Sequence, residues 1–320
     1  MATTATISQV GEFPLITSMV DDLTMGQAVA LGPGDDSAVF QVDGSAVVST
    51  DVLVEEVHFR RRWSTATDVG RKAVAVNVSD IEAMGAVPVA LVVGFSAPGD
   101  LPASWAREFM AGMAAESQKA GVSVVGGDTT GGPVVSIAVT VIGQTAGMAP
   151  VRRDGAVPGD EVAVIGQLGL PAAGLVLLGR GFRSPRAVVA AQRCPEVPYG
   201  QGLVAAKAGA HAMIDVSDGL LADLGHIAQA SGFGMDIDTS KLDIAEPVRT
   251  VGMATGVDPL TWVLAGGEDH ALAATFAPGT VPDGWVVVGR VLSPDEVPDP
   301  TVLVNGQVWQ HERGWTHFSS

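Results

Sequence analysis

Hydrophobic residues follow two different spacings along this chain of 320 residues. Short apolar runs, typical of strands, are separated by segments in which apolar residues recur every three or four positions, as on one face of a helix. Residues 67–84 show the helical spacing, and the helix predicted over 102–120 has Pro102 near its first turn, where a missing N–H is tolerated. Other helices are predicted at 12–20, 170–178, 184–192, 201–208 and 220–230, and strands at 37–42, 45–54, 87–95, 122–125, 134–143, 161–165, 213–215, 235–237, 271–276, 285–291 and 302–308. Strands and helices alternate in both halves, which predicts an α/β or α+β protein of two domains.

Two short turn signals predict β-hairpins. Asp43-Gly44 lies between the strands predicted at 37–42 and 45–54, and Asn305-Gly306 lies within 302–308. Asp-Gly and Asn-Gly pairs favour the positive φ angles of a two-residue hairpin turn. We therefore expect the strands that flank each pair to be hydrogen-bonded to each other.

The segment 147–160 separates the two halves of the chain. It contains Pro150, Pro158, three glycines and four charged residues, a composition typical of a loop between structured regions. The expected domains are therefore residues 1–147 and 148–320.

The charge of the chain limits its partners. There are 35 acidic against 18 basic residues, a formal net charge of -17, while 47% of residues are hydrophobic and the mean hydropathy is +0.33. Binding to nucleic acid or to an anionic membrane depends on clustered Lys and Arg, so neither partner is expected. Phosphates remain possible ligands, because bound metal ions can supply the missing positive charge.

Cysteine content and the N-terminal segment indicate a cytoplasmic protein. Cys194 is the single cysteine, so an internal disulfide and a Cys-x-x-Cys zinc site are excluded. Residues 1–10 have neither a basic region nor a long apolar run, and no stretch of about 18 uninterrupted apolar residues occurs. No signal peptide or membrane span is expected.

Aspartates recur where apolar runs end, beside glycine, serine or threonine. One such cluster would be an ordinary turn. Several of them predict a site for hard divalent cations, because Mg²⁺ takes oxygen ligands together with substrate phosphates. The clusters are Gly34-Asp35-Asp36-Ser37, Ser49-Thr50-Asp51, Asn77-Val78-Ser79-Asp80, Gly126-Gly127-Asp128-Thr129-Thr130, Asp215-Val216-Ser217-Asp218-Gly219 and Gly266-Gly267-Glu268-Asp269.

Some of these residues also have structural interpretations. Asp36 could simply form a helix-entry or hairpin turn, and Ser217 or Asp218 could cap the helix that follows. Arg152 and Arg153 could be a solvated pair or a clamp on a triphosphate.

Asp80 is harder to explain as a structural residue. It lies within an apolar helical segment, where a charge is costly to bury without a partner. Lys72 and Arg71 are eight and nine residues away, which does not match the spacing of neighbours on a helix. A ligand role is favoured.

Common nucleotide-binding and hydrolase motifs are absent. No lysine stands in a Gly-Lys-Ser/Thr sequence, and neither Gly-x-Gly-x-x-Gly, His-Glu-x-x-His nor Gly-x-Ser-x-Gly occurs. Residues 236–240 approach an aspartate-phosphatase motif but lack Thr or Val in the fifth place, so we interpret them as a solvated strand end.

Together the clusters resemble the thiamine-monophosphate kinases, which belong to an ATP-binding superfamily with aminoimidazole ribonucleotide synthetase, selenophosphate synthetase and a hydrogenase-maturation protein. The resemblance covers nearly the whole chain, from residues 11–16 to residues 314–318. The combination with His58, Glu268 and Trp315 distinguishes this family within the superfamily. It implies the two-domain aminoimidazole ribonucleotide synthetase-like fold, and a homodimer in which the N-terminal domains pair their sheets into a barrel.

The resemblance also implies roles for individual residues, with ATP and several Mg²⁺ ions bound between the two domains. The implied metal ligands are Asp36, Ser49, Thr50, Asp51, Asp80, Asp128, Asp215 and Asp218. ATP contacts are implied for Gly127, Asp128, Arg153 and Ser217, and thiamine-monophosphate contacts for His58, Glu268 and Trp315. Trp315 would stack on the cationic thiazolium ring, although it could also be a C-terminal core anchor, and Glu268 could be a turn carboxylate.

The implied reaction converts ATP and thiamine monophosphate to ADP and thiamine diphosphate by direct in-line transfer. No catalytic nucleophile or general base is predicted, since the acceptor phosphate is already largely dianionic at neutral pH. Two alternatives remain: another enzyme of the superfamily with a different acceptor, and a non-catalytic dimer that binds ATP and Mg²⁺. An N-terminal cysteine, typical of selenophosphate synthetases, is absent.

Overall fold

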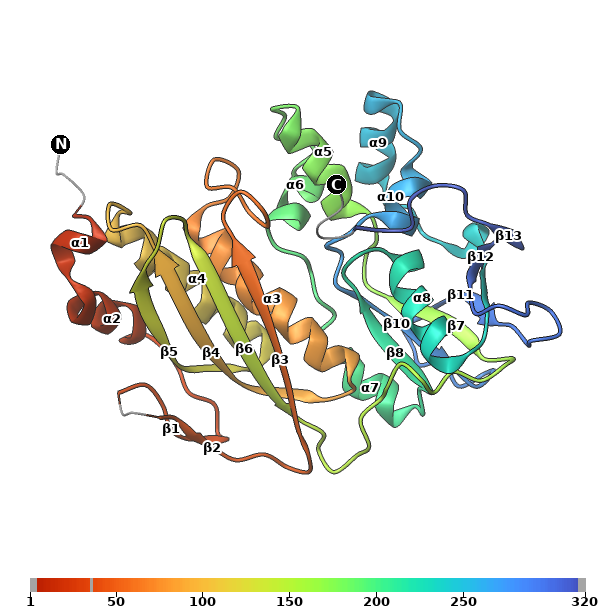
Figure 1. The fold of residues 1–320 in the computed structure, drawn as a ribbon, viewed down its shortest axis with the longest axis horizontal. Coiled ribbons are helices and arrows are strands. Elements are labelled where there is room, and N and C mark those ends of the chain that lie inside the picture. The colour runs from red at the N-terminus through yellow and green to blue at the C-terminus, as the bar shows by residue number, and fades with distance from the viewer. Residues whose placement is uncertain (1–4, 35–36, 316–320) are drawn as a thin grey trace. The chain divides into compact units, whose positions relative to one another are not determined.

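The structure, a computed structural model, describes residues 5–34 and 37–315. The predicted ligand Asp36 lies outside the described residues. The chain folds as two compact units, called unit 1 (Met1–Ile81 and Val87–Gly147) and unit 2 (Glu82–Ala86 and Met148–Ser320). Each unit contains both helices and sheet, so the predicted mixed fold class is confirmed (Figure 1).

Unit 1 is built on a four-stranded sheet with the strand order β3-β6-β4-β5, in which only β4 and β5 run parallel. Its strands are β1 (Val29–Leu31), β2 (Val39–Phe40), β3 (Ala46–Val54), β4 (Val87–Ala97), β5 (Ser123–Gly131) and β6 (Ser136–Gln144). Its helices are α1 (Ile7–Val10), α2 (Glu12–Val20), α3 (Ala66–Ala83, whose last two residues belong to unit 2) and α4 (Ala103–Ala120). β3 and β5 are therefore the opposite edges of the sheet.

Helices α3 and α4 cover one face of this sheet (Figure 1). Phe95 of β4 stacks on Phe109 of α4, with ring centroids 5.5 Å apart. The two helices approach each other so closely that a Cβ atom on Gly70 of α3 would lie 2.0 Å from the carbonyl oxygen of Phe109. On the other face, β1 and β2 cover one end of the sheet, while Val48 and Val52 of β3 stay 61% and 47% exposed.

The hairpin predicted at Asp43-Gly44 is wrong. β2 pairs with β1, which the sequence pattern did not predict, and β3 pairs with β6 over nine residue pairs, from Ala46–Gln144 to Val54–Ser136. Turn chemistry favours a reversal of the chain, but the long ladder with β6 satisfies far more backbone hydrogen bonds than the short segment before Asp43 could. The hairpin predicted at Asn305-Gly306 is confirmed, since β12 and β13 flank these residues and pair with each other.

Unit 2 is built on a seven-stranded sheet with the order β13-β12-β9-β11-β7-β10-β8. Helices α8 and α10 contribute to the core on one face, and α7 to the core on the other. The strands are β7 (Glu161–Ile165), β8 (Ala212–Val216), β9 (Met235–Ile237), β10 (Ala271–Phe276), β11 (Val286–Val291), β12 (Val302–Val304) and β13 (Gln307–Val308). The helices are α5 (Leu170–Gly179), α6 (Arg186–Arg193), α7 (Gln201–Lys207), α8 (Leu220–Ser231), α9 (Glu246–Thr255) and α10 (Pro259–Ala265), with a 3₁₀ turn at Thr239–Lys241.

Among the helices formed by residues 5–34 and 37–315, none is both long and apolar enough to cross a bilayer.

Candidate functional site

The cluster Asp215-Val216-Ser217-Asp218-Gly219 lies where edge strand β8 ends and helix α8 begins. Every residue of β8 is buried, which fixes the point at which the chain emerges from the sheet. Gly219 has a φ of 132° and lies so close to Ala265 that a Cβ atom would be 2.9 Å from its carbonyl carbon. Only glycine fits this turn, so the position and direction of the Ser217-Asp218 segment are tightly constrained.

Two distant segments dock on this turn through backbone hydrogen bonds. The N–H of Glu268 donates to the carbonyl of Ser217 at 2.6 Å, and the N–H of Trp315 donates to the carbonyl of Asp218 at 2.9 Å. The close approach requires glycine in both segments, since a Cβ atom on Gly267 or Gly314 would lie 3.0 Å or 2.6 Å from the same two carbonyl oxygens. The structure thus brings together five predicted site residues of unit 2: Asp215, Ser217, Asp218, Glu268 and Trp315.

The docked segment around Glu268 has an unusual backbone. Glu268 and His270 have φ angles of 72° and 48°, in the left-handed region that is costly for residues other than glycine. His270 is held by a 2.7 Å hydrogen bond from its N–H to the carbonyl of Val216, and its Nδ1 lies 3.2 Å from Oδ2 of Asp215. Strain of this kind is typical of functional sites, where surrounding contacts hold the backbone in place.

Trp315 has an exposed side chain, 60% accessible in this structure. A core anchor would bury its ring, so this exposure argues against that interpretation. The backbone bond to Asp218 keeps the residue beside the predicted metal ligands.

Two buried carboxyl groups beside this turn, Asp223 and Asp269, were assigned no individual role, and only Asp269 lies in one of the predicted clusters. Burial raises the pKa of Asp223 to about 7, and the negative charges of Asp215 and then Asp218 add to the shift. Burial likewise raises the pKa of Asp269 well above its usual value, although the N–H of Gly169 donates to this carboxylate. A signal was present for Asp223, because an aspartate on the apolar face of the amphipathic segment 220–230 is costly to bury without hydrogen-bond partners.

Unit 1 holds a second set of predicted residues where β3 faces α3. Ser49 of β3 donates through Oγ to Oδ2 of Asp80 at 2.6 Å, and the N–H of Asp51 donates to Oδ1 of Asn77 at 3.1 Å. Side chains alternate along a strand, so Ser49 and Asp51 share one face and Thr50 lies on the other. Thr50 instead donates to the backbone carbonyl of Val139 at 3.0 Å.

His58 follows β3 in a short loop of unit 1. Its Nδ1 accepts a 3.0 Å hydrogen bond from the N–H of Val54, which fixes the orientation of the ring. The Nζ of Lys72 donates to the carbonyl of His58 at 3.1 Å and ties the same loop to α3.

Asp128 lies away from these residues, on the opposite edge strand β5. The sheet register forms a row that runs from Asp51 through Val139 and Val93 to Gly127. Three strand spacings separate its ends by about 14 Å, too far for Asp51 and Asp128 of one chain to bind the same ion. The alternation of side chains also puts Asp128 on the sheet face that α3 and α4 leave uncovered. Of the two glycines before Asp128, Gly127 packs on the backbone of Val93, where a Cβ atom would lie 2.1 Å from the carbonyl oxygen, whereas a Cβ atom on Gly126 would meet nothing within 4 Å.

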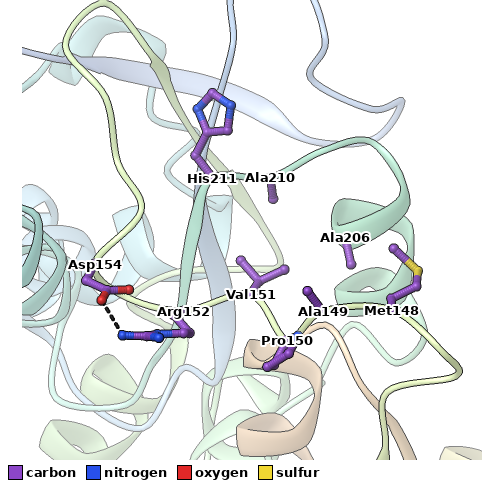
Figure 2. A pocket seen from close by; sticks show the side chains of 9 residues that line it. All are labelled: Met148, Ala149, Pro150, Val151, Arg152, Asp154, Ala206, Ala210 and His211. Atoms are coloured by element: carbon purple, nitrogen blue, oxygen red, sulfur yellow. Dashed lines mark hydrogen bonds and ion pairs between the residues drawn. The ribbon is translucent and has the colours of Figure 1, made fainter. Parts of the chain in front are cut away.

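The two neighbouring arginines at the domain boundary have different surroundings. Arg152 pairs with Asp154, while the carbonyl of Arg153 accepts a hydrogen bond from Ser231. Arg152 also lines a cavity of about 410 Å³ in unit 2, together with Met148, Ala149, Pro150, Val151, Asp154, Ala206, Ala210 and His211 (Figure 2). The backbone of Arg152 forms an isolated parallel β-bridge with Ala212, the first residue of β8. This cavity therefore lies at the end of β8 that is away from Asp215.

The donor chemistry of both sets suits Mg²⁺, because it consists of carboxylate and hydroxyl oxygens. No group of three or more His, Cys, Asp or Glu side chains surrounds a common centre within the part of the chain that the structure describes. The residues therefore fit the ion only by the type of their oxygen atoms.

Comparisons with known proteins agree on one family. Residues 34–145 match the family model described as AIR synthase related protein, N-terminal domain, and residues 157–277 match AIR synthase related protein, C-terminal domain. A thiamine-monophosphate kinase from Mycobacterium tuberculosis is 47% identical over 315 residues, which cover 98% of this chain and 93% of that protein.

Solved structures give the same result. The thiamine-monophosphate kinase of Stenotrophomonas maltophilia superposes with a TM-score of 0.78 at 32% identity, covering 92% of this chain and 95% of the other. AaThiL complexed with AMPPCP and TMP superposes with a TM-score of 0.79 at 30% identity, covering 99% and 100%. The chain belongs to the thiamine-monophosphate kinase family and has its two-domain AIR synthase-like fold.

Proposed function

We infer that this protein transfers the γ-phosphoryl group of ATP to thiamine monophosphate, which gives thiamine diphosphate and ADP. The observation that carries the inference is full-length similarity to thiamine-monophosphate kinases, at 47% identity for the M. tuberculosis protein. The related AaThiL was solved with AMPPCP and TMP together, a pair that corresponds to donor and acceptor. In unit 2, five of the residues assigned to the metal ions or to these two ligands lie at one turn, which supports the proposal.

The transfer needs no enzyme nucleophile. The acceptor is a phosphate oxygen with a second pKa of about 6, so it is already ionised at neutral pH and needs no general base. The main obstacle is repulsion, since two like charges about 4 Å apart cost about 4 kcal/mol at an effective dielectric of 20. We therefore propose direct in-line transfer, with the protein contributing position and charge neutralisation.

Bound Mg²⁺ would supply positive charge between the donor and acceptor phosphates. Its carboxylate ligands in unit 2 would be Asp215 and Asp218. Asp215 is held in the sheet opposite Leu272 of β10, and the 2.6 Å and 2.9 Å hydrogen bonds to the carbonyls of Ser217 and Asp218 hold the turn that carries Asp218. The remaining proposed ligands are Asp36, Ser49, Thr50, Asp51, Asp80 and Asp128.

The substrates would contact neighbouring residues. Gly127, Arg153 and Ser217 are proposed to bind ATP. His58, Glu268 and Trp315 are proposed to bind thiamine monophosphate, and the exposed indole of Trp315 suits a cationic ring.

We also propose that two chains pair through the uncovered sheet face of unit 1. This face carries the exposed valines Val48 and Val52, and Val48 lies beside Ile142 of β6, so it presents apolar surface to solvent in a single chain. Unit 1 would then serve dimerisation and ATP–Mg²⁺ binding, with unit 2 as the C-terminal α/β domain, in the cytoplasm. If Asp51 and Asp128 serve one catalytic centre, the pairing could bring in Asp128 from the second chain.

The test is an ATP-consumption assay with thiamine monophosphate as acceptor, in which phosphorus-31 resonances identify the product. The expected result is stoichiometric ADP and thiamine diphosphate that require Mg²⁺. ADP formation that does not depend on thiamine monophosphate would favour another acceptor within the superfamily. ATP binding without any ADP release would favour a non-catalytic ATP–Mg²⁺ protein.

A further inference from the structure

Asp223 lies on the first turns of α8 and reaches back to the turn that carries the proposed ligands. Its side chain is 3% exposed. Oδ2 accepts hydrogen bonds from the N–H of Asp218 at 3.1 Å and from the N–H of Gly219 at 3.0 Å. A single oxygen atom therefore holds two consecutive peptide groups.

The contact made by Asp223 resembles one half of a capping box. Gly219 is the residue at the N-cap of α8 and has no side chain that could accept a hydrogen bond from the first turn of the helix. Asp223, four residues further along, accepts instead from the N–H groups of Gly219 itself and of Asp218, as the returning half of a capping box does. The turn is thereby held by a contact within unit 2.

The surroundings make a carboxyl group at this position costly. Asp223 is flanked by Leu220, Leu224 and Ile227, all of which are fully buried in the core of unit 2. A leucine would fill this space without the penalty of burying a polar group. An acidic residue that fits here only through two backbone donors of the Asp218-Gly219 turn points to a role in the geometry of that turn.

We propose that Asp223 is a positioning residue: it fixes the backbone of Asp218 and Gly219, so that the side chains of Ser217 and Asp218 are held in the orientation that binds Mg²⁺ and nucleotide. The proposal rests on the ligand roles of Ser217 and Asp218 given under the proposed function. In this role, the position of Oδ2 of Asp223 matters for binding, and its negative charge does not.

Two substitutions separate position from charge. Asp223→Asn removes the charge but keeps an acceptor oxygen at the same distance along the side chain. Asp223→Glu keeps the charge but extends the side chain by one methylene, about 1.5 Å, which displaces the acceptor. A positioning role predicts that the glutamate variant is the damaging one, whereas a role for the charge predicts the reverse.

Asp160 provides a matched control in the same unit. It is also 3% exposed and also holds a turn, because its Oδ2 accepts from the N–H of Val157 at 2.9 Å. Its other contact is Nδ1 of His211, beside the cavity at the far end of β8. Asp160→Glu should disturb packing to a similar extent without touching the Ser217-Asp218 turn.

The experiment measures binding of Mg²⁺ with AMPPCP by calorimetry, and the Mg²⁺ concentration for half-maximal transfer, in the full-length protein. We expect Asp223→Glu to weaken binding at least about 10-fold and to raise the Mg²⁺ requirement. Asp223→Asn and Asp160→Glu should stay within about 3-fold of the original protein. Thermal melting identifies any variant that is not folded, and the asparagine variant alone still tests the proposal.

Several results would overturn this role. They are a 10-fold loss in Asp223→Asn, unchanged binding in Asp223→Glu, or an equal loss in Asp160→Glu. If the unaltered protein binds Mg²⁺ with AMPPCP but does not phosphorylate thiamine monophosphate, the proposed function fails while the binding comparison still supports the positioning role. If it binds no nucleotide, both fail.

Discussion

The acidic residues of unit 2 and those of unit 1 are arranged in contrasting ways. In unit 2, segments around residues 217, 268 and 315 meet at the end of one strand, joined by backbone hydrogen bonds of 2.6 Å and 2.9 Å. In unit 1, Ser49 and Asp80 are paired at one edge of the sheet, whereas Asp128 lies on the strand at the other edge. The residues of the first arrangement meet at one place, and those of the second are divided between two edges of a sheet.

The difference reflects how each set is built. In unit 2 the proposed ligands lie on turns that glycines bring within contact distance of each other, so the backbone determines the site. In unit 1 they lie along strands, and strand spacing keeps the two edges of a four-stranded sheet apart. The divided set of unit 1 can serve one centre only with a ligand that spans it or with residues of a second chain. Experiments that add or remove a second chain therefore distinguish unit 1 from unit 2.

Removal of a proposed ligand of unit 1 should have the largest effect. Asp51→Asn and Asp128→Asn should each lower phosphoryl transfer by about two orders of magnitude or more, because neutral amides bind Mg²⁺ poorly and leave phosphate repulsion uncompensated. Steady-state assays across Mg²⁺ concentrations measure this, with the exposed Asp100→Asn as control. Near-normal turnover at limiting Mg²⁺ would remove the residue from the site.

The same two variants show whether the divided set is completed by a second chain. Mixed and allowed to exchange subunits, they should regain up to about a quarter of the original activity if Asp51 and Asp128 act from different chains, because half of the dimers are hybrids with one intact centre of two. If both act from the same chain, the mixture stays inactive.

A charge on the uncovered face of unit 1 should disrupt pairing. Val48→Asp places a carboxylate on apolar surface that the proposed dimer buries, so we expect a shift from dimer to monomer at micromolar concentrations. Sedimentation velocity measures the shift. Val286→Asp is the control, since Val286 is 48% exposed on β11 of unit 2. A monomeric original protein, or a dimer that tolerates the charge, would contradict the proposed interface.

A smaller and more selective effect is expected at the Ser217-Asp218 turn of unit 2. Trp315→Ala should weaken thiamine-monophosphate binding about 10-fold and ATP binding much less, since a desolvated cation–π contact contributes roughly 1–2 kcal/mol. Calorimetry with each ligand separates the two. Phe182→Ala, at the same 60% exposure, is the control and should affect neither. Equal losses for both ligands would favour the core-anchor interpretation.

The smallest expected effect is on the pH dependence of the protein's stability in the absence of metal ions. The folded-state pKa of Asp223 is raised from 3.8 to about 7, so the folded protein binds the proton more tightly than the unfolded chain. Stability should therefore fall as pH rises from about 4 to 7. Asp223→Asn should lose part of this slope, with a melting temperature a few degrees higher than the original at pH 7.5 in EDTA. An unchanged slope would mean that Asp223 stays ionised throughout.

Local patterns predicted the elements of this fold well where local forces decide them. The helix predicted at 67–84 is α3 at Ala66–Ala83, and the Asn305-Gly306 hairpin forms because adjacent strands and turn chemistry agree. The Asp43-Gly44 hairpin failed because β3 found a nine-residue partner about 90 residues away, a choice that no local pattern records.

For the candidate site too, local sequence determined some features and the tertiary structure determined others. Sequence alone identified oxygen-bearing turns and their glycines, because charge in an apolar run and glycine at strand ends are visible in a single chain. Only the tertiary structure decided that Ser217, Glu268 and Trp315 meet, that Asp128 lies on the far edge from Asp51, and that Asp223 reaches back to hold a turn. The physical reason is that residue type is a local property, whereas proximity depends on strand order and on which backbone groups find partners across the fold.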